Sequence, residues 1–362
     1  MADTDYQVNS PLAVKRWSSE LMKEALKKTF ALQFMGEDSN SIIQIKTELN
    51  KGAGDRITFG IRQQLQGAGV SGDNTLEGNE EALITYTQNI TIDQLRHAVR
   101  SNGKVSEQRV AFNVRNECRD GLADWWADRI DTWFFNQVCG HSAQADTRYT
   151  GMQAVSAPDS DHQVLGNIGA TVAAGTVATA ESSLSATTVA RFHLGMIDRA
   201  VERAQTGVNT MRPVRVGSKE LYVAFLHPRQ ITALRISAGT SQWNDIQQAA
   251  LQASNSDDNP IYTGAAGIYN KTIIHTSTRV PLVVGATGGT LNVARGVLVG
   301  AQAACMAFGR GHGKNTFDWN EELFDYRNKL GVEAGCIGGL VKTRFNGSDF
   351  AAITMSSYEP AA

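Results

Sequence analysis

The alternation of apolar and polar residues predicts a long β-hairpin in the first third of the chain. Ile57, Phe59 and Ile61 alternate with polar residues or glycine, and Ile84–Ile92 is apolar or aromatic at nearly every second position. Side chains at this spacing lie on one face of a strand. The connecting residues 67–80, GAGVSGDNTLEGNE, cannot form a packed core. A two-stranded ribbon is marginally stable alone, so we expect it to rest on its own domain or on a neighbouring subunit.

Helical spacing of apolar residues predicts two long helices, over Val14–Phe34 and Lys104–Cys139. The charges of the first are mixed, as on an ordinary amphipathic packing helix. The second would be roughly 50 Å long at 1.5 Å per residue. It carries Trp125, Trp126 and Trp133, and we interpret these three side chains as core packing because tryptophan buries a large apolar area.

The remaining chain predicts shorter elements. His141–Ser185 is rich in Ala, Thr, Ser and Gly and indicates a surface excursion. Further helices are predicted at Thr187–Gln205, Arg229–Ile236 and Trp243–Ala253, and strands at Leu221–Leu226, Ile273–His275 and Leu282–Val284. The chain then ends in a predicted hairpin, in which Gly338–Phe345 and Phe350–Ser356 flank the strong turn signal Asn346-Gly347.

Composition narrows the class of protein. Hydrophobic residues make up 42% and charged residues 19%, as in ordinary globular chains. The 34 basic and 36 acidic residues give a net charge of −2, which argues against a protein whose main task is to bind nucleic acid. The four cysteines form no CxxC pair and no signal peptide precedes them, so we expect reduced thiols in a cytoplasmic protein. No apolar run is long enough to span a bilayer.

Motifs for catalysis are incomplete. Gly67–Gly72 matches GxGxxG, but turn residues follow it where a cofactor-binding helix should begin. The loop Gly309–Asn315 lacks both the first glycine and the Ser or Thr of a phosphate loop. Asp159, Asp161 and His162 form a weak candidate metal cluster. HExxH and GxSxG are absent. We therefore predict no catalytic site, no cofactor and no metal.

Several longer segments of the chain are distinctive. In the first third these are Gly54–Phe59 (GDRITF), Gly72–Glu81 (GDNTLEGNEE) and Ile92–Arg100 (IDQLRHAVR), and near the end Gly300–Ala304, Phe308–Arg310, Phe324–Gly331 and Lys342–Gly347. These segments resemble the N4-like family of phage major capsid proteins. The similarity runs from about residue 30 to 356, with a divergent middle at His141–Ser185.

The resemblance implies the HK97-like fold, an α+β fold with an N-terminal arm, an extended hairpin called the E-loop, a long spine helix, and peripheral and axial domains. The expected divisions are 1–50 for the arm, 51–103 for the E-loop and its flanks, 104–186 for the peripheral domain with the spine helix and the low-complexity excursion, 187–296 for the axial domain, and 297–362 for the return to the peripheral sheet and the C-terminal hairpin.

The function implied is a major capsid protein that self-assembles into the icosahedral head shell around the double-stranded DNA of a tailed phage. Expected partners are other copies in pentamers and hexamers, a separate scaffolding protein, the portal, a decoration or cement protein and packaged DNA bound nonspecifically, but no membrane. Assembly is expected in the host bacterial cytoplasm, and residues 1–40 are expected to contact other subunits. The alternatives are the shell protein of an encapsulin-like compartment and a nucleotide-binding enzyme.

Two groups of residues are candidates for contacts. On the E-loop they are Gly67, Gly69, Gly72, Asp73, Asn74, Glu77, Glu80 and Glu81. The basic residues expected to face another subunit or the packaged DNA are Arg96, Arg100, Arg310, Arg327, Lys329 and Arg344.

Overall fold

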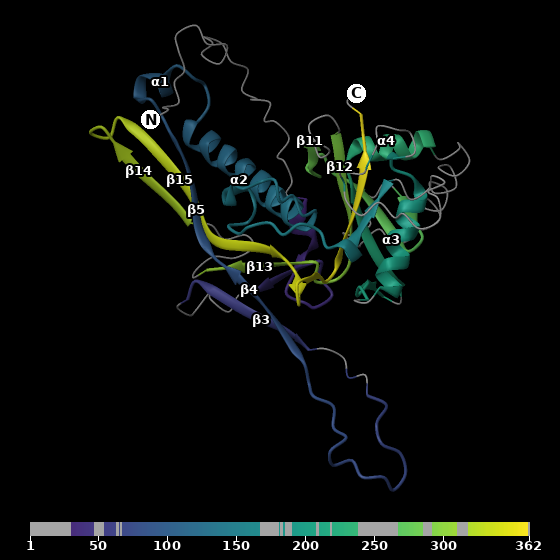
Figure 1. Ribbon diagram of the computed structural model, residues 1–362. Helices are drawn as coiled ribbons and strands as arrows, with labels where there is room; N and C mark the ends of the chain where they lie inside the picture. Colours follow the sequence, from purple (N-terminus) through teal and green to yellow (C-terminus); the bar gives the residue numbers. More distant parts are fainter. Residues whose placement is uncertain are drawn as a thin grey trace.

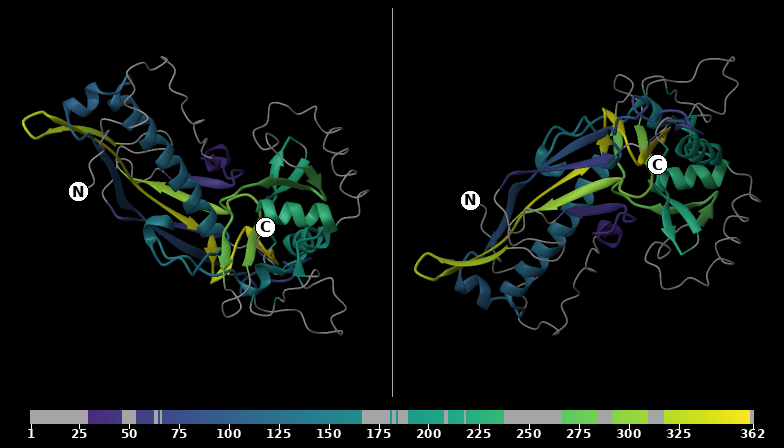
Figure 2. Two further views of the ribbon diagram at one scale, coloured as in Figure 1. Left: turned by 90° about the horizontal axis from the view of Figure 1, so that it is seen from above. Right: turned by 90° about the horizontal axis from the view of Figure 1, so that it is seen from below.

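Two β-sheets and one projecting hairpin organise the molecule (Figure 1). The computed structural model describes residues 30–46, 54–62, 65, 67–166, 181, 184, 190–207, 210–217, 219–237, 267–284, 292–309 and 318–360. The six-stranded sheet with its long helix extends toward one end of the elongated body, and the eight-stranded sheet with two shorter helices lies at the other (Figure 2).

The six-stranded sheet has the order β1-β2-β13-β15-β14, with β5 also paired to β15. Its strands are β1 (Met35–Gly36), β2 (Ile43–Lys46), β5 (Asp93–Arg100), β13 (Ala304–Phe308), β14 (Asp318–Phe324) and β15 (Lys329–Lys342). β15 is the central strand, since β5, β13 and β14 all pair with it in antiparallel fashion.

The predicted spine helix is interrupted. Instead of one helix over Lys104–Cys139, α1 (Lys104–Gln108) ends before α2 (Val114–Val138) begins. The break lies at Asn113, whose backbone is extended and whose side chain accepts a hydrogen bond from the Arg115 backbone N–H at 3.0 Å. Asparagine at this position caps a new helix, so a local side-chain bond overrides the helical spacing of the apolar residues.

The three tryptophans of α2 pack as predicted. Trp126 and Trp133 are buried. The Trp126 indole donates to the Ala334 carbonyl of β15 at 3.2 Å, and the Trp133 indole donates to the Arg148 carbonyl at 2.7 Å. Trp125 is half-buried and stacks on the His97 ring at 4.5 Å between centroids. The helix is therefore fixed to its sheet by both apolar area and directional bonds.

The eight-stranded sheet has the order β6-β18-β12-β8-β10-β9, with β11 on β12 and β7 on β8. Its strands are β6 (Gln163–Leu165), β7 (Val214–Val216), β8 (Lys219–Leu226), β9 (Gly267–Tyr269), β10 (Thr272–Thr276), β11 (Leu282–Val284), β12 (Asn292–Val299) and β18 (Ala352–Tyr358). These include the three short strands predicted in this part of the chain, which are confirmed.

Two helices accompany this sheet. The predicted helix at Arg229–Ile236 is confirmed as α4 (Pro228–Ser237). The helix predicted from Thr187 starts only at Leu194, as α3 (Leu194–Thr206), because His193 has an extended backbone. The helix predicted at Trp243–Ala253 lies outside the described residues.

The predicted C-terminal hairpin is correct only at its turn. Asn346 and Gly347 both have positive φ, 52° and 78°, and they join the short strands β16 (Arg344–Phe345) and β17 (Ser348–Asp349). The longer flanking strands do not pair with each other, because β15 stays in the six-stranded sheet and β18 pairs with β12 and β6 in the eight-stranded sheet. The strands described from residue 297 onward are thus divided between the two large sheets and the short β16–β17 pair.

The start of the described chain packs on its own subunit. Residues 14–29 of the predicted first helix lie outside the described residues, and Ala31–Phe34 form a short 3₁₀ helix, η1. The backbone N–H groups of Phe30 and Ala31 donate to the Asp131 carboxylate of α2 at 2.9 and 2.7 Å. For the rest of residues 1–40, contact with other subunits stays a prediction.

Candidate assembly surfaces

The predicted E-loop is a hairpin whose tip is in solvent. β3 (Arg56–Arg62) and β4 (Thr85–Thr91) pair antiparallel with Ile57 opposite Ile90, as the alternation predicts. Beyond them the chain projects far from the body (Figure 1). All of residues 71–85 are exposed. Such a projection can make few contacts with its own subunit.

Glycines give the tip its shape. Gly69 and Gly72 have φ of 72° and 66°, a left-handed conformation that L side chains rarely adopt. A Cβ at either position would meet no atom within 4 Å. Conformation rather than lack of space is therefore the reason for glycine at both positions.

The candidate polar residues of the tip are organised by local hydrogen bonds. The Glu81 carboxylate accepts from the Gly67 N–H at 2.7 Å, and the Glu80 carboxylate accepts from the Gly78 N–H at 2.8 Å. The Asn74 amide donates to the Ser71 carbonyl at 2.9 Å. Asp73 and Glu77 are exposed as well, and the tip carries no basic residue between 67 and 84. The tip therefore presents a locally acidic surface.

Apolar side chains are also exposed on the projection. Leu65, Leu76 and Leu83 are 57%, 61% and 58% exposed, and Ile84 is 48% exposed. Scattered apolar residues are normal on a surface, but several on one thin projection make it a candidate interaction site. Ile84 belongs to the alternation that predicts the second strand, but Leu65, Leu76 and Leu83 interrupt a polar loop and form no pattern, so the sequence does not mark them as contact residues.

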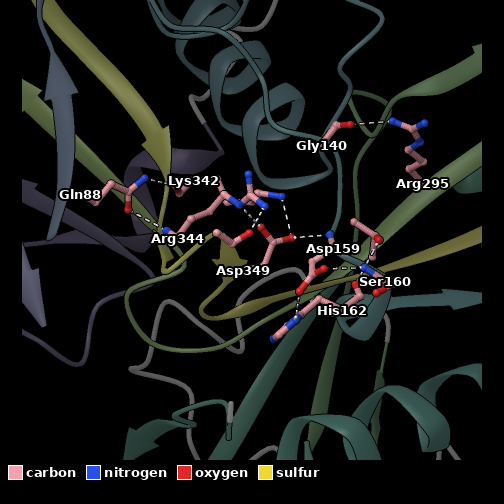
Figure 3. Close-up of polar contacts among 11 residues, drawn as sticks. Gln88, Gly140, Asp159, Ser160, His162, Arg295, Lys342, Arg344 and Asp349 are labelled. Carbon is pink, nitrogen blue, oxygen red and sulfur yellow. Dashed lines mark hydrogen bonds and ion pairs between the residues drawn. The ribbon is translucent and has the colours of Figure 1, made fainter. Parts of the chain in front are cut away.

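The root of the hairpin is fixed by both apolar and polar contacts. Ile57 and Ile90 are buried against Ala307 of β13. The Gln88 side chain of β4 donates to the Lys342 carbonyl at 2.7 Å and accepts from the Arg344 N–H at 2.7 Å (Figure 3). Sequence reasoning missed this role of Gln88, although a polar residue at an inward position of an alternating strand was the available signal.

The segment that Gln88 binds contains a buried ion pair. The Lys342 Nζ lies 2.8 Å from Asp349 Oδ2, and both side chains are 1% exposed. Arg344 Nε lies 2.9 Å from the other oxygen of the same carboxylate. The Asp159 N–H donates to Asp349 Oδ2 at 3.3 Å. Burial lowers the pKa of Lys342, and the adjacent carboxylate opposes that shift.

A second polar cluster holds the neighbouring loops to the eight-stranded sheet. Arg295 of β12 forms a bidentate pair with Glu181 at 2.6 Å for both bonds and donates to the Gly140 carbonyl at 2.7 Å. The Ser356 hydroxyl of β18 donates to Glu181 at 2.6 Å. These bonds, together with the Lys342–Asp349 pair, form the junction at which the chain passes between the two sheets (Figure 3).

The weak metal candidate belongs to this junction. His162 is buried, and its Nδ1 lies 3.8 Å from Asp159 Oδ2. Burial lowers the pKa of His162. Across the described residues, no group of three or more His, Cys, Asp or Glu side chains could hold a metal ion. Asp159 and His162 act here as packing and bonding residues.

β14 is the second exposed surface. All of Asp318–Phe324 is exposed, unlike the strands of the eight-stranded sheet. It is the terminal strand in the sheet order, and Trp319 and Leu323 are 40% and 53% exposed. Tyr326, in the turn that follows, is fully exposed. An edge strand with exposed apolar residues is a surface suited to pairing or packing with another chain.

Most of the candidate basic residues contact their own chain. Arg96 pairs with Glu333 at 3.4 Å, the Arg100 guanidinium lies over the Phe324 ring at 5.5 Å, and Arg344 binds Asp349. Arg327 is exposed in the turn after β14, and Lys329 begins β15. Arg310 lies outside the described residues. The pairing of β5 with β15 places Arg100 opposite Gly331, near the start of β15 where Lys329 stands, whereas Arg344 follows the other end of β15.

Other chemical features are structural in the described chain. The cysteines Cys118, Cys139, Cys305 and Cys336 are all buried free thiols. Gly67–Gly72 lies in the hairpin tip and opens no helix. None of the helices within the described ranges has the length and apolar character needed to cross a membrane.

Comparisons with known proteins agree with one another. The sequence profile described as "Phage capsid protein" matches residues 5–361. The chain is 28% identical over 349 residues to the major capsid protein of Pseudomonas phage KPP25, covering 91% of this chain and 89% of that protein. It resembles the capsid of Ralstonia phage GP4 with 33% identity, a TM-score of 0.84 and 99% coverage of both chains.

A more distant structure shares the fold. The Cyanophage Pam1 capsid asymmetric unit matches with 20% identity, a TM-score of 0.74 and full coverage of both chains. The predicted α+β, HK97-like capsid fold is confirmed. The profile match over residues 5–361 and the 33% identity along the Ralstonia phage capsid show that this chain belongs to the phage capsid protein family.

Proposed function

We propose that this chain is the major capsid protein that self-assembles into the icosahedral head shell of a tailed phage and encloses its double-stranded DNA. The observation that carries the proposal is the family match across residues 5–361, together with the similarity to the major capsid protein of Pseudomonas phage KPP25 and to the capsid of Ralstonia phage GP4. A purely structural role agrees with this family, and no step of the proposed function requires catalysis.

Assembly in this proposal is noncovalent. The acidic tip and the exposed leucines of the hairpin lie on an adjacent subunit, where apolar burial and charge contacts add to each other. β14 provides a second contact with another copy through its edge and its exposed Trp319 and Leu323. Each contact can be modest because a closed shell repeats it many times, and linked contacts strengthen one another.

The two sheets correspond to the two domains expected of the family. We assign the six-stranded sheet and α2 to the peripheral domain, and the eight-stranded sheet with α3 and α4 to the axial domain. In this assignment, residues 1–50 are the arm, 51–103 the E-loop and its flanks, and 104–186 mainly peripheral. Residues 187–296 are mainly axial, while 297–362 contribute to both sheets through β13, β14, β15 and β18.

The expected partners follow from this role. Copies of the chain form pentamers and hexamers, assisted by a separate scaffolding protein, and the shell accommodates a portal and a decoration or cement protein. The finished protein belongs to the virion capsid after assembly in the host bacterial cytoplasm. DNA contact is nonspecific and salt-sensitive. Among the basic candidates, Arg327 is exposed in the turn after β14 and is the one we favour for this contact, whereas Arg96 and Arg344 have acidic partners in their own chain.

Electron microscopy of the purified chain, expressed alone and with its scaffolding protein, tests this proposal. Closed shells of uniform size are expected in at least one sample. Folded monomers or small oligomers in both samples, across salt and protein concentration, would contradict it. Shells that enclose a protein cargo in place of DNA would favour the encapsulin-like alternative. A thermal shift on adding a nucleotide would favour the enzyme alternative.

A further inference from the structure

Gln88 occupies an unusual position for a polar side chain. It lies on the inward face of β4, between the half-buried Tyr86 and the buried Ile90. Its amide makes two hydrogen bonds of 2.7 Å to the backbone, one to Lys342 O and one from Arg344 N. A side-chain amide used in this way replaces a peptide group and joins the hairpin to a segment that is not its strand partner.

The backbone that Gln88 binds is held in place. Lys342 and Asp349 form a fully buried ion pair, and Arg344 binds the same carboxylate. Moving this backbone would expose or separate buried charges, which is costly. The two hydrogen bonds of Gln88 therefore end on the segment that carries this buried ion pair, as Figure 3 shows.

Other contacts at the hairpin root fix its orientation less strictly. Ile57 and Ile90 pack on Ala307, and the Phe59 ring meets the Phe345 ring edge-on at 6.2 Å. Apolar contact is largely non-directional, so these residues by themselves allow the ribbon to rotate. A further hydrogen bond, from the Gln153 amide to the Thr91 carbonyl at 3.1 Å, holds the end of β4 that leads into β5 and lies farther from the tip than Gln88. Paired hydrogen bonds favour a narrow range of angles. A small rotation at the root becomes a large displacement at the distant tip.

We propose that Gln88 is the positioning residue of the hairpin: it sets the angle of the projection relative to the junction between the two sheets. This inference rests on the proposed function, since the angle determines where the tip meets an adjacent subunit. Loss of Gln88 leaves the hairpin intact but lets it sample several angles. Subunits with variable angles then close into shells inefficiently or into shells of mixed size.

Spin labels test the angle in the isolated subunit. Thr85→Cys at the exposed end of β4 and Asn116→Cys on the exposed face of α2 place one label on the hairpin and one on the body, and the four native thiols are buried. Pulsed electron resonance should give one narrow distance distribution for the otherwise unchanged chain. Gln88→Met, which is nearly isosteric but makes neither hydrogen bond, should lose the narrow peak.

The matched control is Asn89→Ala. Asn89 is the next residue of β4, and its exposed side chain accepts from the Thr58 hydroxyl within the hairpin at 2.7 Å, without contacting the junction. This variant should retain the narrow peak and the shell yield. Gln88→Met should reduce the yield of uniform shells on the order of tenfold, the effect of losing two hydrogen bonds at every subunit.

The two experiments distinguish failure of this inference from failure of the proposed function. If the unchanged chain forms no shells, the proposed function fails, while the distance distributions still test the role of Gln88. An unchanged distribution or a normal shell yield with Gln88→Met overturns the inference. Gln88→Asn, with a shorter amide, is the second variant. If neither variant folds, Gln88 is needed for folding of the body and the positioning role is also overturned.

Discussion

The strand β8 and the hairpin tip are both parts of one chain, but they meet opposite surroundings. Residues 221–226 of β8 are buried, with β10 and β12 on either side. Residues 71–85 of the hairpin are all exposed, including Leu76 and Leu83. The side chains and the backbone of residues 221–226 are covered within the subunit, whereas the exposed surface of the hairpin can be covered only by another molecule. Folding of the subunit and assembly of the shell should therefore depend on different residues.

The largest expected effect comes from removing the tip. Replacing residues 67–80 by a two-residue turn should abolish closed shells in electron micrographs. The thermal unfolding midpoint of the subunit should stay within a few degrees of its original value, because the deleted residues make no core contact. Normal shells from this variant would show that the hairpin tip is not an assembly surface.

A point variant at the tip serves as a milder form of the same test. Proline cannot adopt the φ of 72° found at Gly69, so Gly69→Pro must reshape the tip without shortening it. We expect the same loss of shells with an unchanged unfolding midpoint. Ala68→Gly, at the preceding exposed position, is the control and should assemble normally.

A variant at the junction between the two sheets should have the opposite effect: it should lower the stability of the subunit itself. Asp349→Ala leaves Lys342 buried without its partner, and breaking a buried ion pair in this way costs about 3–5 kcal/mol of folding free energy. Urea unfolding of the subunit measures this loss. Arg199→Ala, which breaks an exposed pair on α3, should change the free energy of unfolding by less than about 1 kcal/mol. If the two variants lower the free energy of unfolding equally, burial does not make the Lys342–Asp349 pair more important than the exposed pair.

The sequence predicts some of these elements and not others, and the difference depends on what buries each residue. The alternation in the hairpin indicates that one face of the ribbon is apolar, and the continuous apolar run of β8 indicates that both faces of that strand are buried, so both elements are predicted correctly. The prediction that the long strands on either side of Asn346-Gly347 pair with each other is wrong, because these two residues specify a turn but not which strands lie beyond it. The ion pair of Lys342 and Asp349 joins residues that look like surface charges in the sequence.

The candidate surfaces show a similar limit. Glycine and acidic residues in 67–80 indicate an exposed tip, and the structure agrees. β14 has the sequence DWNEELF, which follows neither strand nor helix spacing, because a strand exposed along its whole length has no buried face to mark. The residues of a surface that functions only between subunits are chosen to fit the partner surface. The sequence of one chain does not show that partner, so it does not reveal such a surface.

An intermediate effect is expected at β14. Leu323→Ser removes an exposed apolar side chain that would be buried against a second copy, so the protein concentration needed for assembly should rise roughly tenfold. Urea unfolding of the subunit should change little, since the side chain is already in solvent. Leu323→Met keeps the apolar area and should assemble normally. If the serine variant assembles at the original concentration, β14 is not an assembly contact.

The smallest effect concerns folding alone and depends on pH. Asp131 is 4% exposed, and burial raises its pKa to about 6, although hydrogen bonds from Ala31 and Phe30 favour the charged form. Because the pKa is higher in the folded than in the unfolded state, the folded state binds the extra proton as the pH falls. This carboxyl should therefore add about 1 kcal/mol of stability between pH 8 and pH 5.

Asp131→Asn tests that sign. The variant is neutral at every pH, so its gain in unfolding free energy from pH 8 to pH 5 should be smaller than that of the unchanged chain by about 1 kcal/mol. Burial lowers the pKa of histidines such as His162, so these residues reduce the stability of the protein as the pH falls over the same range. Their effect is the same in both chains and cancels in the difference. Urea titrations at several pH values measure it. An identical pH dependence in both chains would mean that burial does not raise the pKa of Asp131 in solution.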